Sequence, residues 1–130
     1  MGDATETEYA SACAAVSDSD SRAIRAVLDR IGDKWSLLVI GELSHGVRRF
    51  TGLLRGIPGV SQRMLTLTLR QLERDGLVTR TVHAEVPPRV EYELTPVGET
   101  LIPHAIALAH WAVEHYTSIE TSRASFDAGS

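Results

Sequence analysis

Residues 61–80 carry the side chains best suited to binding chemistry, and the ligand they suit is a polyanion. Read as a helix at 100° per residue, this stretch places three arginines on one face and three leucines on the other. A guanidinium group offers a rigid fork of donors that fits phosphate oxygens and guanine edges. The alternative is that the arginine face is only exposed to water. The side chains predicted to make contacts are Ser61, Gln62, Arg63, Thr66, Leu67, Arg70 and Arg74.

A short helix and a tight turn are predicted to position this arginine face. Ser61 can accept hydrogen bonds from the first turn, and Gly76 tolerates the left-handed conformation that ends a helix. Residues 50–56 favour a second short helix, and residues 57–60 form a linker with Pro and Gly. Two short helices joined in this way are typical of a helix-turn-helix. The arginines that precede them, predicted to clamp phosphates unless they are only solvated, are Arg48 and Arg49.

Two runs of β-propensity follow, at residues 78–84 and 89–94. In the second run apolar and acidic side chains alternate, which indicates a half-buried strand. Pro87 and Pro88 stiffen the loop between the runs, and Arg89 lies beside them. We therefore predict a hairpin wing whose two prolines and arginine contact DNA, with the arginine in a minor groove.

Residues 22–31 and 35–43 are each predicted to be helical. The first has one apolar face and a cap at Ser21 or Asp20. The second is apolar on almost every side and so belongs in the centre of the domain. The fold class expected from all these elements is mainly α with a small β-hairpin (α+β), a winged helix-turn-helix with additional N- and C-terminal dimerisation helices.

The last helix is predicted to open at Thr95 and Pro96, to be kinked or restarted at Pro103, and to fray after Tyr116. It carries two apolar stripes. One stripe suffices to dock the helix on its own domain, and the other has the spacing of helix pairing, so we predict a homodimer. The alternative is a monomer in which this helix is more deeply buried. The docking stripe is Val97, Leu101, Ala105, Leu108 and Ala112, and the pairing stripe is Ile102, Ile106, Ala109, Val113 and Tyr116.

The chain has 130 residues, which indicates one domain. Its net charge of −4 is unevenly distributed, because residues 1–21 hold five acids and no Lys or Arg, whereas residues 48–80 hold seven arginines and two acids. A basic centre can bind nucleic acid even when the total charge is negative. No apolar run approaches the roughly 18–20 residues of a membrane span, and the first residues lack a signal-peptide pattern, so a cytoplasmic location is expected.

Cys13 is the one cysteine, which excludes an intrachain disulfide. It lies in residues 1–20, expected to be a flexible acidic arm that precedes the DNA-binding and dimerisation domain at 21–120 and a flexible tail at 121–130. Cys13 is either a redox sensor or an incidental thiol, and its acidic neighbours disfavour the thiolate that sensing needs.

Sequence signatures of enzymes are absent. No P-loop, dinucleotide glycine fingerprint or nucleophile elbow occurs, and the three histidines of the last helix fall on different faces. We predict no enzymatic activity, no cofactor and no metal site. The remaining alternative to a DNA-binding protein is a winged-helix module that binds another protein without reading DNA.

Several motifs occur in order: IGDKWSLLVIGEL (31–43), RRF (48–50), GIPGVSQRMLTLTLRQLERDGLVTR (56–80) and VPPRVEYELT (86–95), followed by Pro103 and Trp111. Together they resemble the HxlR-type transcriptional regulators over roughly residues 22–116. The resemblance implies a dimeric winged helix that binds operator DNA. It also implies a small-molecule or electrophile effector, because many relatives respond to electrophiles, quinones, aldehydes or oxidants, often through a cysteine near the N-terminus. In the family that cysteine stands near the position of Ser21 or Arg22, and Cys13 lies upstream of it.

The residues and the resemblance together predict a sequence-specific regulator that binds double-stranded DNA as a homodimer. The helix at 61–75 would enter the major groove, with Gln62, Arg63 and Thr66 near bases or phosphates. Arg70 and Arg74 would contact the flanking backbone. A two-fold dimer predicts a near-palindromic operator with half-sites about 34 Å apart.

Overall fold

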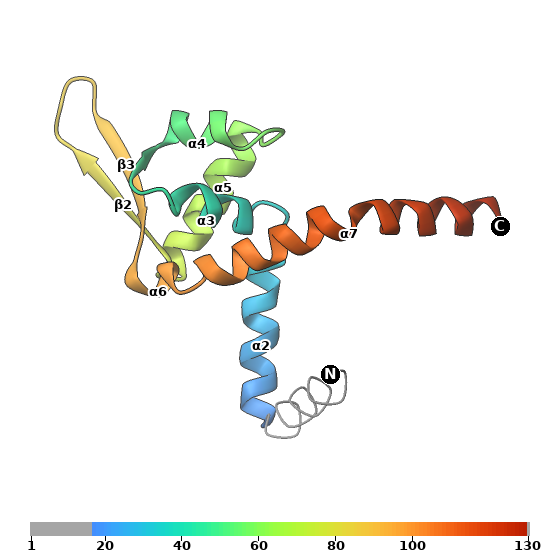
Figure 1. Ribbon diagram of the computed structural model, residues 1–130. Helices are drawn as coiled ribbons and strands as arrows, with labels where there is room; N and C mark the ends of the chain where they lie inside the picture. Colours follow the sequence, from blue (N-terminus) through green and yellow to red (C-terminus); the bar gives the residue numbers. More distant parts are fainter. Residues whose placement is uncertain (1–16, 130) are drawn as a thin grey trace. The chain divides into compact units, whose positions relative to one another are not determined.

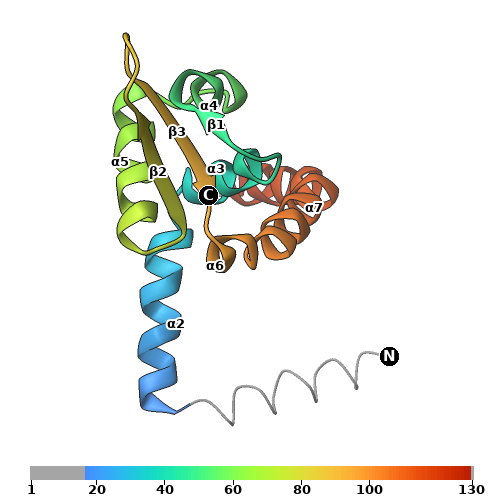
Figure 2. The ribbon, with the colours of Figure 1, turned by 90° about the vertical axis from the view of Figure 1, so that its left-hand side faces the viewer.

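The structure is a computed structural model that describes residues 17–129 (Figure 1). It contains two compact units, Met1–Asp33 and Lys34–Ser130. Within the described residues the first unit holds helix α2, and the second holds all the other helices and strands (Figures 1 and 2). Between residues 17 and 129, no helix combines the length and apolar character needed to cross a membrane.

Helix α2 (Asp18–Ile31) begins earlier than predicted. The predicted cap at Ser21 or Asp20 is wrong, because Ser17 forms a capping box in which its hydroxyl accepts from the Asp20 amide at 3.2 Å. Residues 18–20, predicted as part of the flexible arm, are therefore helical. No residue of α2 is buried, so its predicted apolar face of Ile24, Val27 and Leu28 is exposed.

Helix α3 (Ser36–Leu43) is central in the second unit, as predicted. Val39, Ile40 and Leu43 are buried, and the helix packs against α5 and α7. It is not covered on every side, because Leu38 is 50% exposed. The core that surrounds α3 consists of Val39, Ile40, Leu43, Leu53, Ile57, Leu65, Leu69, Leu72, Val78, Tyr92, Leu94 and Ala105.

The helix-turn-helix consists of α4 (Phe50–Gly56) and α5 (Gln62–Arg74), and its boundaries confirm the predicted caps. The Ser61 hydroxyl accepts from the third amide of α5 at 3.1 Å. At the other end Gly76 has φ +75°, its amide donates to the Glu73 carbonyl, and the next amide donates to Leu72. These bonds are those of a Schellman motif, which satisfies carbonyls of the last turn.

The sheet has three antiparallel strands in the order β1-β3-β2, so a third strand joins the predicted hairpin. These are β1 (Arg48–Arg49), β2 (Val78–His83) and β3 (Arg89–Leu94). Val78 pairs with Leu94 and both are buried, which orients one face of the sheet toward the core. The predicted α+β winged helix-turn-helix fold is confirmed.

Helix α6 (Pro96–Glu99) begins at Thr95, whose hydroxyl accepts from the Gly98 amide at 3.0 Å. The chain then restarts as α7 (Ile102–Ala128), with Pro103 in the first turn, where a missing amide hydrogen costs nothing. The expected fraying after Tyr116 is wrong, and residues 121–128 are helical. No Gly or Pro occurs between Pro103 and the end of the helix, so nothing local stops it.

The two predicted stripes of the last helix are only partly matched. Of the docking stripe, Ala105 is buried and Leu101 packs against the core, but Val97 lies in α6 and is exposed, as is Leu108. Ile102 of the pairing stripe packs against the core of its own chain, because it lies in the first turn of α7. The exposed members of the pairing stripe are Ile106, Ala109, Val113 and Tyr116.

Candidate nucleic-acid interface

Helix α5 presents a polar face to solvent because its leucine ridge is held in the core. Leu65, Leu69 and Leu72 are each almost fully buried. Arg63, Arg70 and Arg74 lie on the opposite side of the helix. All seven side chains predicted to make contacts are exposed: Ser61, Gln62, Arg63, Thr66, Leu67, Arg70 and Arg74. The helix thus has the geometry expected of a recognition helix, with an apolar side fixed and a cationic side free.

Thr66 differs from its neighbours on this face, because its hydroxyl already donates to the Gln62 carbonyl at 2.8 Å. Such bonds to the preceding turn are common for threonine in helices. The hydroxyl oxygen can still accept a hydrogen bond, and the methyl group remains available for an apolar contact. Thr66 is therefore suited to accept from a base amino group or to contact a thymine methyl.

Ion pairing separates the arginines of the domain into two groups. Arg48 pairs with Glu42 at 3.2 Å, and Arg89 pairs with Glu85 at 3.2 Å and with Glu91 at 3.8 Å. No ion pair within residues 17–129 involves the remaining arginines of this region, which are Arg49, Arg55, Arg63, Arg70, Arg74 and Arg80. Between residues 48 and 89, the arginines without an ion pair are thus those of α5, the strand residue Arg80, and Arg49 and Arg55 at the two ends of α4.

Arg48 and Arg49, predicted together as phosphate clamps, occupy different environments. The Arg48 side chain is 34% exposed, and its pairing partner Glu42 lies against the backbone of Gly56. The Arg48–Glu42 pair therefore links β1 to α3, next to the C-terminal end of α4. Arg49 is exposed and precedes α4, so its guanidinium group is the more available of the two.

The wing loop at residues 84–88 exposes Pro87 and Pro88, and the bond between Val86 and Pro87 is cis. Arg89 is 31% exposed and is held by two carboxylates. To enter a minor groove it must first leave those partners, so the arrangement favours the exposed prolines over Arg89 as the wing's contact.

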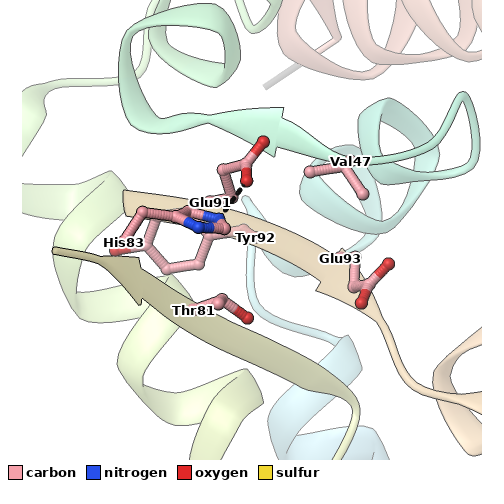
Figure 3. A pocket seen from close by; sticks show the side chains of 6 residues that line it. All are labelled: Val47, Thr81, His83, Glu91, Tyr92 and Glu93. Carbon is pink, nitrogen blue, oxygen red and sulfur yellow. Dashed lines mark ion pairs between the residues drawn. The ribbon is translucent and has the colours of Figure 1, made fainter. Parts of the chain in front are cut away.

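The outer face of the sheet is acidic and poorly suited to DNA. A cleft of about 170 Å³ on this face is lined by Val47, Thr81, His83, Glu91, Tyr92 and Glu93 (Figure 3). The Nε2 atom of His83 pairs with Glu91, which is also the second partner of Arg89. The carboxylates of Glu91 and Glu93 would repel phosphates, so this face of the wing does not suit DNA.

Arg80 lies beside the candidate interface but was not among the predicted contact residues. It lines a cleft with Arg70 and Thr66 of α5. The signal that could have identified it is the alternation of β2, which places Arg80 on the same strand face as Val78 and Val82, toward the recognition helix.

The exposed surface of α7 is unusually apolar. Four members of the pairing stripe are exposed, and Val113 is 84% exposed. Trp111 adds a further aromatic surface and lies 4.9 Å from the His115 ring. Exposed apolar side chains gathered along one helix are typical of surfaces that bind a partner. The candidate redox residue Cys13 lies outside the described residues.

Comparison with known proteins assigns the family. A profile of the HxlR-like helix-turn-helix family matches residues 30–120. An HTH-type transcriptional regulator of Methanothermobacter thermautotrophicus is 46% identical over 99 residues, which make up 76% of each chain. The structure of the transcriptional regulator YtfH from Salmonella typhimurium gives a TM-score of 0.70 at 38% identity and covers 76% of this chain and 88% of that one.

The redox regulator HypR in its reduced form also gives a TM-score of 0.70, at 40% identity over 76% of this chain and 98% of that chain. The motif resemblance, the profile match and the shared fold agree with one another. This chain is a member of the HxlR-like helix-turn-helix family of transcriptional regulators.

Proposed function

We propose that this regulator binds double-stranded DNA sequence-specifically and acts as a homodimer on a near-palindromic operator. The observation that supports this most directly is the exposed face of α5, where three arginines without ion pairs in the described residues stand opposite a buried leucine ridge. The major groove accepts an α-helix and displays a full code of donors and acceptors.

The contacts divide by position along α5. Gln62 and Arg63 lie in the first turn, where a recognition helix reaches deepest, so we assign them, together with Thr66, to the bases. Arg70 and Arg74 lie further along the helix and are assigned to flanking phosphates. Leu67 meets a thymine methyl or packs locally, and Arg49 supplies a phosphate contact at the entrance of α4.

The homodimer is proposed to form through α7, with α2 as a second contributor. The exposed side chains of Ile106, Val113 and Tyr116 recur at spacings of seven and three, the pattern of a pairing helix. The exposed apolar face of α2 is a second surface that a partner would cover. Two recognition helices related by a two-fold axis would then read half-sites about 34 Å apart.

We further propose that an electrophile or oxidant changes the affinity of the regulator for DNA. As a bacterial-type regulator, the protein would act in the cytoplasm, where it meets DNA. Its support is the similarity to HypR, which is described as a redox regulator. Cys13 is the one thiol that an oxidant could modify. Operator affinity should fall after treatment with diamide in the wild type and stay constant in Cys13→Ser; equal affinities with and without oxidant in the wild type would refute a role for the thiol.

A DNA titration at several salt concentrations tests the central proposal. Operator fragments taken from the DNA upstream of the coding region should bind with a steep fall of log affinity against log salt. Arg63→Ala should lower operator affinity and relax sequence preference, whereas Arg74→Ala should weaken all duplexes about equally. A protein-binding module without DNA readout would bind no duplex at any salt concentration.

A further inference from the structure

A cleft of about 360 Å³ lies between the recognition helix and the wing, and it brings together charged side chains from two elements. Its lining consists of Thr66, Leu69, Arg70 and Glu73 from α5, and Arg80 and Tyr92 from the sheet. Because α5 packs directly on β2, the two arginines face one shared space although they are ten positions apart.

The position of Arg80 follows from the register of the hairpin. Arg80 pairs with Tyr92, which is almost buried on the core side of the sheet. Val78, two residues earlier on the same strand face, is also buried. Arg80 therefore emerges where the sheet passes beyond the core and meets the side of α5, and its side chain is exposed.

The charges in this cleft do not balance. Neither Arg70 nor Arg80 forms an ion pair within residues 17–129, and Glu73 is the one carboxylate in the lining. Two guanidinium groups that share a cleft repel each other, and a bound anion would remove that repulsion. A phosphodiester fits well, because it carries one negative charge and two unesterified oxygens that two donor forks can hold.

We propose that this Arg70–Arg80 cleft binds one backbone phosphate of DNA in each half-site, immediately beside the base-reading face of α5. The proposal rests on the proposed function and extends it in two respects. It assigns Arg80 as a phosphate ligand that shares its phosphate with Arg70, and it makes Glu73 an opposing charge that weakens binding.

The test compares four variants, Arg70→Ala, Arg80→Ala, the double variant and Glu73→Gln, by fluorescence anisotropy with operator and with unrelated duplex. Each single arginine variant should lower the affinity for both duplexes by roughly tenfold per cleft, and so by roughly a hundredfold for a dimer. This is the loss expected when a hydrogen bond to a charged group is removed. The double variant should be little weaker than either single one, because both remove the same contact. Glu73→Gln should bind both duplexes more tightly.

Salt dependence and backbone chemistry locate the contact. The negative slope of log affinity against log salt should become less steep by about 0.9 per lost phosphate contact, or about 1.8 for the dimer. This change should be the same in the single and double variants. An operator with one neutral methylphosphonate linkage per half-site, scanned along the backbone, should bind the wild type less tightly at one linkage and leave the double variant unaffected there. Arg123→Ala, which removes the same charge from an exposed site near the end of α7, is the matched control and should behave as wild type.

The proposal is overturned if Arg80→Ala keeps the affinity and salt slope of the wild type, if the two arginine effects add fully, or if Arg123→Ala weakens binding as much. It is also overturned if Glu73→Gln weakens binding. Failure of the proposed function has a different signature, since the wild type would then bind neither duplex.

Discussion

Replacing Gly98 by alanine would perturb α6, the short helix that connects the wing to α7. Gly98 is buried in α6, and its amide donates to the Thr95 hydroxyl. A Cβ atom at this position would overlap the carbonyl oxygen of Leu77 and lie 3.2 Å from Cδ2 of Leu94. The Leu77 oxygen is itself fixed, because it accepts from the Thr95 amide at 3.0 Å.

The expected loss in free energy of unfolding follows from the fact that the Cβ atom would meet a backbone carbonyl. A rotamer change can relieve a clash with a side chain but not one with a hydrogen-bonded carbonyl, so α6 must move away from Leu77, which precedes the start of β2. Overpacking typically costs about 1–3 kcal/mol, and a backbone clash should lie near the upper limit, at about 3 kcal/mol. For a domain of about 100 residues this lowers the thermal unfolding midpoint by about 12–24 °C.

Gly41→Ala is the matched control, since a Cβ atom at Gly41 would meet no atom within 4 Å. Gly41 lies within α3, where alanine loses less backbone entropy than glycine, so this variant should be more stable by about 0.5–1 kcal/mol. Circular dichroism melts at matched protein concentration would measure both changes. A Gly98→Ala midpoint equal to that of the wild type would refute the close approach of α6 to Leu77 and with it the magnitude above.

Three further substitutions test separate parts of the structure. Ser61→Ala removes the cap of α5 and should cost about 1 kcal/mol in denaturant unfolding; no loss would mean that the hydroxyl does not cap the helix. Val113→Glu places a charge in the exposed apolar stripe and should shift the protein to monomer in sedimentation velocity, whereas Ser118→Glu, on the opposite side of α7, should not. Arg48→Ala should cost less than about 1 kcal/mol because its pair with Glu42 is partly exposed, and should leave operator affinity near that of the wild type; a large affinity loss would show that Arg48 contacts DNA after all.

The recognition helix could be predicted from sequence because several local signals agree there. The leucine spacing, the Ser61 cap and Gly76 all indicate the same boundaries, and the structure has them. The alternation that ends in Leu94 likewise predicted the buried face of β3. In both elements each side chain meets one of two environments, core or water, and periodicity distinguishes these two.

Helix ends were harder, because competing signals lie close together. Ser17 and Ser21 are both acceptable caps, and only the reciprocal bond with Asp20 favours the earlier one. At the other terminus α7 continues beyond Tyr116 to Ala128, where the apolar stripe no longer runs, so periodicity could not mark the end of the helix. The packing of Ile102 against the core also could not be predicted from the local sequence, because it depends on how the first turn of α7 meets the core.

Charge pairing was the property that sequence could least reveal, and it is the property on which the functional argument depends. Glu42 of α3 reaches Arg48 of β1, and Arg89 lies between the carboxylates of Glu85 and Glu91 because of the wing geometry. Acids are thus paired with arginines on α3 and the wing, while no described acid pairs with the arginines of α5. Since exposed charges are screened within about 10 Å at 0.1 M salt, a phosphate near α5 is governed by this local imbalance rather than by the net charge of −4. A net negative charge is therefore compatible with the proposed binding of DNA along α5, and the acidic outer face of the sheet would help to orient a duplex toward that helix.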